Sequence, residues 1–420
     1  MRRIHPNLTA DRIRRRDLLK LGCAAVASAT WIDTRRSAGA DSDSPRRAPD
    51  NSASFLKRIT HPLAIAMWDF SWLERRWPGA GYEDWDDVLG QLKSRGYDAV
   101  RIDAYPHLVA TSPQKTWEIL PCWNQELWGS PALTRVQVQP HLNQFIEKCA
   151  RHNILVGLST WWREDRENTR MKIKSPQLLA EVWRKTLDSI ADAKLLDQIL
   201  YVDLSNEFCI PPWTPWIPRS TNRHSPEGVR WMSDSIAVLK KAHPQLSYTF
   251  SFTSEYDTWQ KQDVSMLDFL ELHLWMTHFF DFYDKVDYHY EEFDPKGYVN
   301  LQKRAESLYR QNPRHWQACL EKGIDLLENW SRLSGKPLMT TECWGVVTYK
   351  DWPLLNWDWV KELCELGVKR AAKTGRWAAI ATSNFCGPQF VGMWRDVGWH
   401  RRLTDIIHQA PLEFVKAGQP

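Results

Sequence analysis

Two glutamates stand at the ends of strand-like apolar runs, where a carboxylate can be presented to a substrate. Ile199–Leu204 is followed shortly by Asn206 and Glu207, and Leu338–Thr341 is followed directly by Glu342. An apolar run that stops at a carboxylate is typical of a parallel barrel strand that delivers an acid to the mouth of the barrel. Two such acids are the minimum apparatus for cleaving a glycosidic bond.

The elements that must position these acids alternate between strand and helix eight times. Short apolar runs separated by helical patterns favour parallel strands buried on both faces. An open doubly wound sheet would also alternate, but eight units with no change of composition favour one closed barrel. We therefore expect an α/β fold, a single (β/α)8 TIM barrel with long βα loops over residues 58–420. The expected strands are Leu63–Met67, Ala99–Ile102, Ile154–Leu158, Ile199–Leu204, Tyr248–Ser251, Phe269–Leu274, Leu338–Thr341 and Trp377–Thr382.

Helix signals fall between these runs. Ser175 and Ser225 each precede a proline, which predicts an N-cap followed by a first-turn proline. The expected helices are Trp85–Ser94, Pro140–Arg151, Ser175–Ala193, Ser225–His243, Arg314–Ser331, Trp357–Lys373 and Arg401–His408. Residues 103–137 and 275–311 are long insertions that could wall the site into a pocket.

In such barrels the active site lies at the carboxyl ends of the strands. In this scheme Glu207 is the general acid/base, with a raised pKa, and Glu342 stays ionised through charge pairing with Arg101. Asn206 is placed to bind a sugar hydroxyl, and His273 to orient a carboxylate or a hydroxyl. The substrate-binding candidates at the strand ends are Trp68, Asp69, Arg101, Asp103, Trp161, Asn206, His273, Trp275, Trp344 and Asn384.

Structural roles remain open for several of these side chains. Arg101 could form a barrel-wall ion pair with Asp103 or Asp203, and His273 could be a buried, hydrogen-bonded histidine. Asp69 and Asp103 could cap loops. The chain has 25 tryptophans, whose flat rings suit the apolar faces of sugars. We nevertheless expect more than half of those in the βα loops to pack the loops onto the barrel.

The positive charge of the chain is concentrated at its N-terminus. Residues 1–40 hold nine Lys/Arg and three Asp/Glu, so residues 41–420 carry 46 basic and 48 acidic side chains. A body of this balance gives no indication of nucleic acid binding. Arg14-Arg15-Arg16-Asp17-Leu18-Leu19-Lys20 resembles a twin-arginine export signal, and Ala38-Gly39-Ala40 suits a signal peptidase.

These features predict a signal peptide at 1–40, a flexible linker at 41–57 and export to the periplasm or the medium by the twin-arginine machinery. The apolar stretch Leu21–Ile32 is too short to span a membrane, which needs about 20 residues, so no stable membrane anchor is expected. A disordered basic tail is the alternative. The scattered cysteines show no metal-ligand spacing, and neither a metal nor another cofactor is expected.

Taken together, the site motifs resemble those of the cellulase-like retaining glycoside hydrolases of clan A, of which family 5 is the best-known branch. The resemblance rests on Val100-Arg101-Ile102, Asn206-Glu207, His273 in Glu271-Leu272-His273-Leu274-Trp275, and Glu342 in Thr341-Glu342-Cys343-Trp344. It spans roughly residues 62–407 and is most similar to bacterial proteins called cellulase-like. It implies that Glu207 is the acid/base and Glu342 the nucleophile of a retaining reaction.

The chain departs from the family 5 pattern at three places. Thr160-Trp161 stands where those enzymes carry a histidine, Trp275 where they carry a tyrosine, and Asn384-Phe385 where they carry a tryptophan. These changes leave both glutamates in place but put the cellulose subsites in doubt.

The expected function is therefore a secreted glycosidase that acts on an oligo- or polysaccharide with β-linkages. A sugar-binding barrel without catalysis is the alternative. A metal-dependent barrel hydrolase is a third class, for which the strand ends offer no convincing His/Asp ligand set.

Overall fold

The protein is described by a computed structural model. It covers residues 54–122, 130, 132–253, 256–278, 281–288, 296–349 and 355–414. The predicted signal peptide and most of the predicted linker lie outside the described residues. The last part of that linker is packed, because Ser54–Arg58 forms a 3-10 helix with Phe55 fully buried against Phe269, at 5.4 Å between ring centroids. The ordered body thus begins at or before Ser54 rather than at residue 58.

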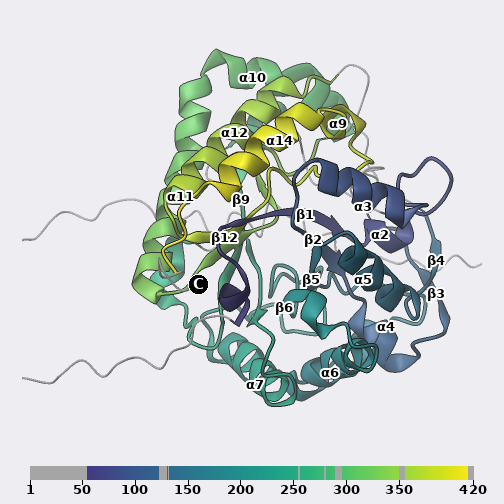
Figure 1. The fold of residues 1–420 in the computed structure, drawn as a ribbon. Coiled ribbons are helices and arrows are strands. Elements are labelled where there is room, and N and C mark those ends of the chain that lie inside the picture. The colour runs from purple at the N-terminus through teal and green to yellow at the C-terminus, as the bar shows by residue number, and fades with distance from the viewer. Residues whose placement is uncertain are drawn as a thin grey trace, which may run out of the picture.

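The strands form a closed parallel barrel with eight strand positions, here called staves, two of which are made of two short strands. This confirms the predicted fold (Figure 1). β12 pairs with both β10 and β1, and the fifth stave is split, so that β7 pairs with β6 while β8 pairs with β9. The staves are β1 (Leu63–Asp69), β2 (Ala99–Asp103), β5 (Leu155–Ser159), β6 (Ile199–Asp203), β7 (Tyr248–Thr249) with β8 (Phe252–Thr253), β9 (Leu270–Trp275), β10 (Leu338–Thr340) with β11 (Cys343–Trp344), and β12 (Trp377–Ile380).

Helices surround the strands on all sides (Figure 1). The predicted caps are confirmed, since Ser175 accepts from Leu178 N and Ser225 from Gly228 N. The helices are α2 (Ser71–Glu74), α3 (Trp85–Ser94), α4 (Pro106–Thr111), α5 (His141–Arg151), α6 (Pro176–Asp192), α7 (Pro226–Ala242), α8 (Phe282–Val286), α9 (Lys296–Asn300), α10 (Glu306–Gln311), α11 (Pro313–Ser334), α12 (Asp358–Lys373), α13 (Val391–Trp394) and α14 (Val397–His408). No helix in the described ranges is long and apolar enough to cross a membrane.

The two predicted insertions carry structure of their own. The first contains α4 and the antiparallel hairpin β3 (Thr116–Ile119) and β4 (Thr134–Gln137). The second holds α8, α9 and α10, with a π-helical turn at Leu301–Ala305. After the split fifth stave, the described residues form a 3-10 helix, Tyr256–Lys261, in place of an α-helix.

The barrel interior is filled by side chains below the mouth. Tyr201 reaches across to β5, where a Cβ on Gly157 would lie 2.5 Å from the tyrosine ring. The same ring packs edge-on against Phe269 at 5.2 Å. Only glycine at position 157 leaves room for this ring, so the barrel interior is closely packed at this level. The polar side chains lie in the layer above it, at the strand ends.

Candidate active site

Arg101 is the centre of the polar layer at the mouth of the barrel. Its Nε and Nη2 donate to both oxygens of Asp69, at 2.8 and 2.7 Å, and its Nη1 donates to Thr341 Oγ1 at 2.8 Å. Nη2 also pairs with Glu342 Oε1. Thus Arg101 joins β1, β2 and the seventh stave, and its predicted pairing with Glu342 is present. The alternative partners Asp103 and Asp203 instead hold loops.

His273 lies among three carboxylates. Its Nδ1 is 3.1 Å from Glu207 Oε1 and 3.5 Å from Glu342 Oε1, and its Nε2 is 2.8 Å from Glu271 Oε2. Burial lowers the pKa of His273, but Glu271 and Glu342 outweigh burial and leave the pKa well above its usual value. The geometry therefore favours an imidazolium that donates toward Glu207.

The two glutamates singled out in the sequence meet at this point. One oxygen of Glu207 and one of Glu342 lie within 4.8 Å of each other, with a nitrogen of His273 within the same distance of both. Each glutamate is 2% exposed. Burial raises the pKa of Glu342 to about 7, against the lowering effect of His273 and Arg101. Arg101 lowers the pKa of Glu342, as expected of the charge pair, but desolvation of the carboxylate is the larger effect.

Glu207, His273 and Glu342 also have the atom types and proximity to hold a metal ion, a grouping that the sequence analysis did not anticipate. However, the raised pKa of His273 favours the protonated ring, which has no lone pair for a metal. Arg101 adds a second positive charge beside Glu342. Both features make this cluster better suited to proton transfer than to a divalent cation.

Asn206, Trp275 and Asn384 at the strand ends carry buried polar atoms that have no hydrogen-bond partner among the described residues. These atoms are both polar atoms of the Asn206 amide, the indole Nε1 of Trp275 and Oδ1 of Asn384, and all three side chains are fully buried. Because buried polar groups are normally paired, these atoms are available to a ligand. Asn206 adjoins Glu207, and the ring of Trp275 contacts His273 at 6.0 Å between centroids.

Four of the predicted substrate-binding side chains, Asp103, Asn384, Trp68 and Trp344, are held in structural contacts. Asp103 accepts from the backbone N of Tyr105 and Trp161, which is the loop-capping alternative. Burial raises its pKa to about 7. Asn384 donates to Val347 O at 2.8 Å.

Trp68 and Trp344 point away from the barrel interior. Trp68 donates to Cys386 O, and its ring packs edge-on against Tyr82. Trp344 donates to Ala381 O and lies against Gly367 of α12, where an added Cβ would be 2.5 Å from the ring. The reason is strand alternation, since neighbouring side chains face opposite sides of a strand. Trp68 and Trp344 therefore support the helix layer in this structure.

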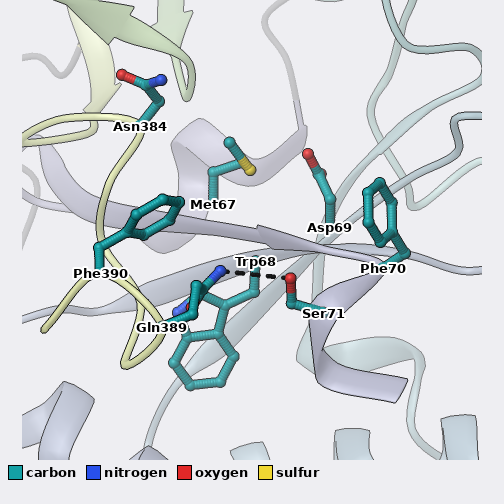
Figure 2. A pocket seen from close by; sticks show the side chains of 8 residues that line it. All are labelled: Met67, Trp68, Asp69, Phe70, Ser71, Asn384, Gln389 and Phe390. Carbon is teal, nitrogen blue, oxygen red and sulfur yellow. Dashed lines mark hydrogen bonds between the residues drawn. The ribbon is translucent and has the colours of Figure 1, made fainter. Parts of the chain in front are cut away.

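A small pocket lies beside Asp69, between the end of β1 and the loop after β12 (Figure 2). Gln389 donates to Ser71 Oγ at 3.3 Å along its floor. The space for the centres of water molecules is about 10 Å³, which is the room of about one water. The lining residues are Met67, Trp68, Asp69, Phe70, Ser71, Asn384, Gln389 and Phe390.

Aromatic rings form a wall beside Asp69, and Phe70 belongs both to this wall and to the lining of the pocket. Phe70 packs edge-on against Trp161 at 5.9 Å, and Trp161 packs against Trp213 at 4.7 Å. Trp213 Nε1 donates to Glu207 Oε2 at 3.1 Å. Of the predicted residues, the structure thus brings Trp161 near the acid pair through Trp213.

Sequence reasoning missed Glu271 and Trp213. Glu271 accepts from both the backbone N and Oγ1 of Thr341 and faces His273. Its position was readable, because Glu271 and His273 alternate with leucines on one strand and must share a face. Trp213 gave no such signal, since it lies in a loop six residues after Glu207.

Comparisons with known proteins identify the family of the chain. A family model described as sugar-binding cellulase-like matches residues 65–408. A protein from Parabacteroides distasonis ATCC 8503, provisionally described as a glycoside hydrolase, is 50% identical over 84% of this chain and 96% of that chain, with a TM-score of 0.83.

More distant solved structures are also similar. A family 5 xyloglucan-specific β-1,4-glucanase from a ruminal metagenomic library is 11% identical over 88% of this chain and 99% of its own, with a TM-score of 0.49. An endo-1,4-β-D-mannanase from Thermotoga petrophila RKU-1 is 13% identical over 77% and 88%, with a TM-score of 0.46. No curated protein matches the chain. The matched family model and the 50% identical relative show that the chain belongs to the sugar-binding cellulase-like family.

Proposed function

We propose that the protein is a glycosidase that cleaves a β-linked glycan with retention of configuration. The observation that carries the proposal is the approach of Glu207 and Glu342, whose nearest oxygens lie within 4.8 Å. Retaining enzymes hold their two carboxyl groups about 5–5.5 Å apart, whereas inverting enzymes need about 6.5–9.5 Å to admit a water. The shorter separation supports direct attack by one of the two carboxylates.

In the proposed reaction Glu342 attacks the anomeric carbon while Glu207 protonates the departing oxygen. The glycosidic C–O bond breaks, its electron pair stays on the leaving oxygen, and a glycosyl ester forms on Glu342. Glu207, now ionised, removes a proton from water, and that water releases the sugar. Arg101 holds Glu342 Oε1, so Oε2 is the oxygen that attacks. Asn206, whose amide lacks a protein partner among the described residues, binds the hydroxyl next to the reacting carbon.

The residues present favour a binding site with few sugar subsites. Both carboxylates are 2% exposed, so a sugar reaches them only when the side chains above them move. The aromatic wall of Phe70, Trp161 and Trp213 stands beside them, with Trp213 in contact with Glu207. These features support action on short chains or chain ends.

The decisive experiment combines product stereochemistry with labelling. A panel of aryl glycosides and oligosaccharides is screened, and the anomeric configuration of the first product is followed by NMR. We expect retention, and we expect a mechanism-based fluoro-glycoside to label Glu342, as shown by peptide mass spectrometry. Inversion of configuration, or labelling of another residue, would overturn the assignment.

The Glu207→Gln variant tests the acid role of Glu207 separately from the nucleophile role of Glu342. General acid–base catalysis contributes about 10²–10⁴-fold, so glycosides with poor leaving groups should lose about this much activity. Activated aryl glycosides should lose far less in the first step, because their leaving groups need no proton. Glu147→Gln, at an exposed position on α5, is the matched control and should retain wild-type rates.

The alternative function is sugar binding without catalysis. The near-complete burial of both carboxylates favours it. It predicts that calorimetry detects sugar binding while the fluoro-glycoside labels nothing.

Export by the twin-arginine pathway is part of the same proposal and rests on Arg14-Arg15-Arg16 and the Ala38-Gly39-Ala40 site. Replacement of Arg15 and Arg16 by Lys should leave the full-length chain in the cytoplasm. The wild-type chain should be recovered outside it with a mature N-terminus near residue 41, as measured by intact mass. A wild-type chain that remains cytoplasmic and uncut would contradict export.

A further inference from the structure

The two oxygens of Glu207 face different donors. Oε1 accepts from His273 Nδ1 at 3.1 Å, on the inner side of the site, where His273 is fully buried. Oε2 accepts from the indole Nε1 of Trp213 at 3.1 Å. Trp213 lies in the loop that follows β6 and is 8% exposed, whereas His273 is fully buried. The oxygen on the side of the more exposed donor is therefore Oε2, and the indole N–H covers it.

An indole N–H donates a hydrogen bond and cannot accept one. An ionised Oε2 accepts this hydrogen bond more strongly than a protonated one, because hydrogen bonds to charged groups are stronger. The contact favours the ionised form of Glu207, whereas acid catalysis needs the protonated form with Oε2 open to the leaving oxygen. The indole N–H therefore competes with the leaving oxygen for Oε2.

The loop that carries Trp213 is held at both ends. The backbone N of Trp213 and of Thr214 both donate to Ile210 O at 3.0 Å. Arg223, 2% exposed, donates to Phe208 O at 2.7 Å, Ser251 O at 3.0 Å and Phe250 O at 3.2 Å. The Trp213 ring is 8% exposed and contacts Trp161, at 4.7 Å between ring centroids. A change of the Trp213 side-chain rotamer would uncover Oε2 without displacing Glu207.

We propose that Trp213 is a specificity-determining residue that keeps Glu207 ionised in the empty enzyme and yields Oε2 to the leaving oxygen when a glycan displaces its indole. This inference rests on the proposed function of Glu207. The displaced ring then stands beside the leaving group, where an apolar face suits an aromatic or sugar aglycone. The Trp213 side chain would therefore determine which leaving groups the enzyme prefers.

Trp213→Phe tests the inference and keeps an aromatic ring of similar shape. Loss of the donor removes a stabilising contact from the ionised acid, so the basic limb of the kcat/KM profile should move upward by about one pH unit. Trp216→Phe is the matched control, because Trp216 lies in the same loop but packs against Trp162 at 5.2 Å. Its profile should overlay that of the wild type. A Trp213→Phe basic limb that coincides with the wild-type limb would overturn the proposal.

A second measurement does not depend on activity. The protein is labelled with ¹⁵N at its indole groups, and the Trp213 N–H signal is assigned as the cross-peak that is missing from the spectrum of Trp213→Phe. Trp213→Tyr serves the same purpose if Trp213→Phe does not fold. Its proton shift should titrate between pH 4 and 10 in the wild type and stay constant in Glu207→Gln. A cross-peak that stays constant in the wild type would overturn the contact. Absence of any glycosidase activity would overturn the proposed function but leave this titration as a test of Trp213.

Discussion

At the residue scale, carboxylates outnumber cations at the mouth of the barrel. Asp69, Glu207, Glu271 and Glu342 surround Arg101 and His273, and all six are buried. Buried charges are tolerated only when they are paired and hydrogen-bonded. The two cations are accordingly shared among several acids, and desolvation keeps the pKa of Glu342 high. The site is thus built to move protons near neutral pH.

The pH profile of the enzyme should report this balance. In the proposed reaction Glu342 must be ionised to attack, and burial raises its pKa to about 7 in the empty site. Since kcat/KM reports the free enzyme, we expect its acidic limb near pH 7. Rates with an aryl glycoside from pH 4 to 10 measure it. A limb at pH 4–5, where an exposed glutamate titrates, would contradict the effect of burial.

Glu271 acts as a positioning residue through His273. Its charge is the largest effect that raises the pKa of His273, and a nearby opposite charge is worth about 1–3 pKa units. Glu271→Gln should therefore lower the pKa of His273 by at least about one unit, as followed by imidazole NMR, and lower kcat more than it changes KM.

The control for Glu271→Gln is Asp203→Asn. Asp203 is equally buried, but it binds Ser159 and Ser251 rather than His273. This variant should leave the titration of His273 nearly unchanged. A His273 titration that moves equally in both variants would mean that the loss of any buried charge, and not the contact with Glu271, sets its pKa.

At the element scale, α14 is attached to the start of the barrel by one ion pair. His408 Nε2 lies 2.7 Å from Asp98 Oδ2, which also accepts from Ala64 N at the start of β1. The hydrogen bond to Asp98 raises the pKa of His408 above its usual value. The pair therefore connects the last helix to the start of the first two strands, β1 and β2.

The stability from this pair should depend on pH. Because the folded pKa of His408 is raised, its contribution is complete below the unfolded pKa of about 6.5 and is lost as pH rises through the folded value. His408→Gln should lower the free energy of unfolding by about 0.5–1 kcal/mol at pH 5.5 and by much less at pH 9. Urea titrations measure both values. The exposed His224→Gln should show no such difference, and an equal loss for His408→Gln at both pH values would contradict the pairing.

At the scale of the whole molecule, the buried acids make stability fall as pH rises. Burial raises the pKa of Asp69, Asp103, Asp203 and Glu342. An acid with a raised folded pKa stabilises the fold at low pH, and this contribution is lost as pH rises through the folded value. The lowered pKa of Glu271 acts in the opposite direction. We expect the melting temperature to decline between about pH 5 and 8.

Glu342→Gln should reduce this decline. At pH 5 the folded wild type holds a neutral glutamic acid, so the amide changes little. At pH 8 the wild-type carboxylate is ionised in a buried site, and a shift from 4.5 to about 7 corresponds to at most about 3 kcal/mol. The variant should therefore be more stable than the wild type at pH 8 but not at pH 5, as measured by calorimetry. Equal melting temperatures at pH 8 would show that Arg101 and His273 fully compensate burial.

Much of this protein is determined locally by its sequence. Alternating apolar runs and helix caps predicted eight strands to within about two residues, because hydrophobic period and capping are local properties. The polar ends of those runs placed Glu207, Glu342, Arg101 and His273 at one mouth. Only the tertiary structure decided that Trp68 and Trp344 face the helices, that Asp103 caps a loop, and that Trp213 covers Glu207. Those outcomes depend on how distant segments pack and on how deeply each carboxylate is desolvated, and neither is encoded in the spacing of residues along the chain.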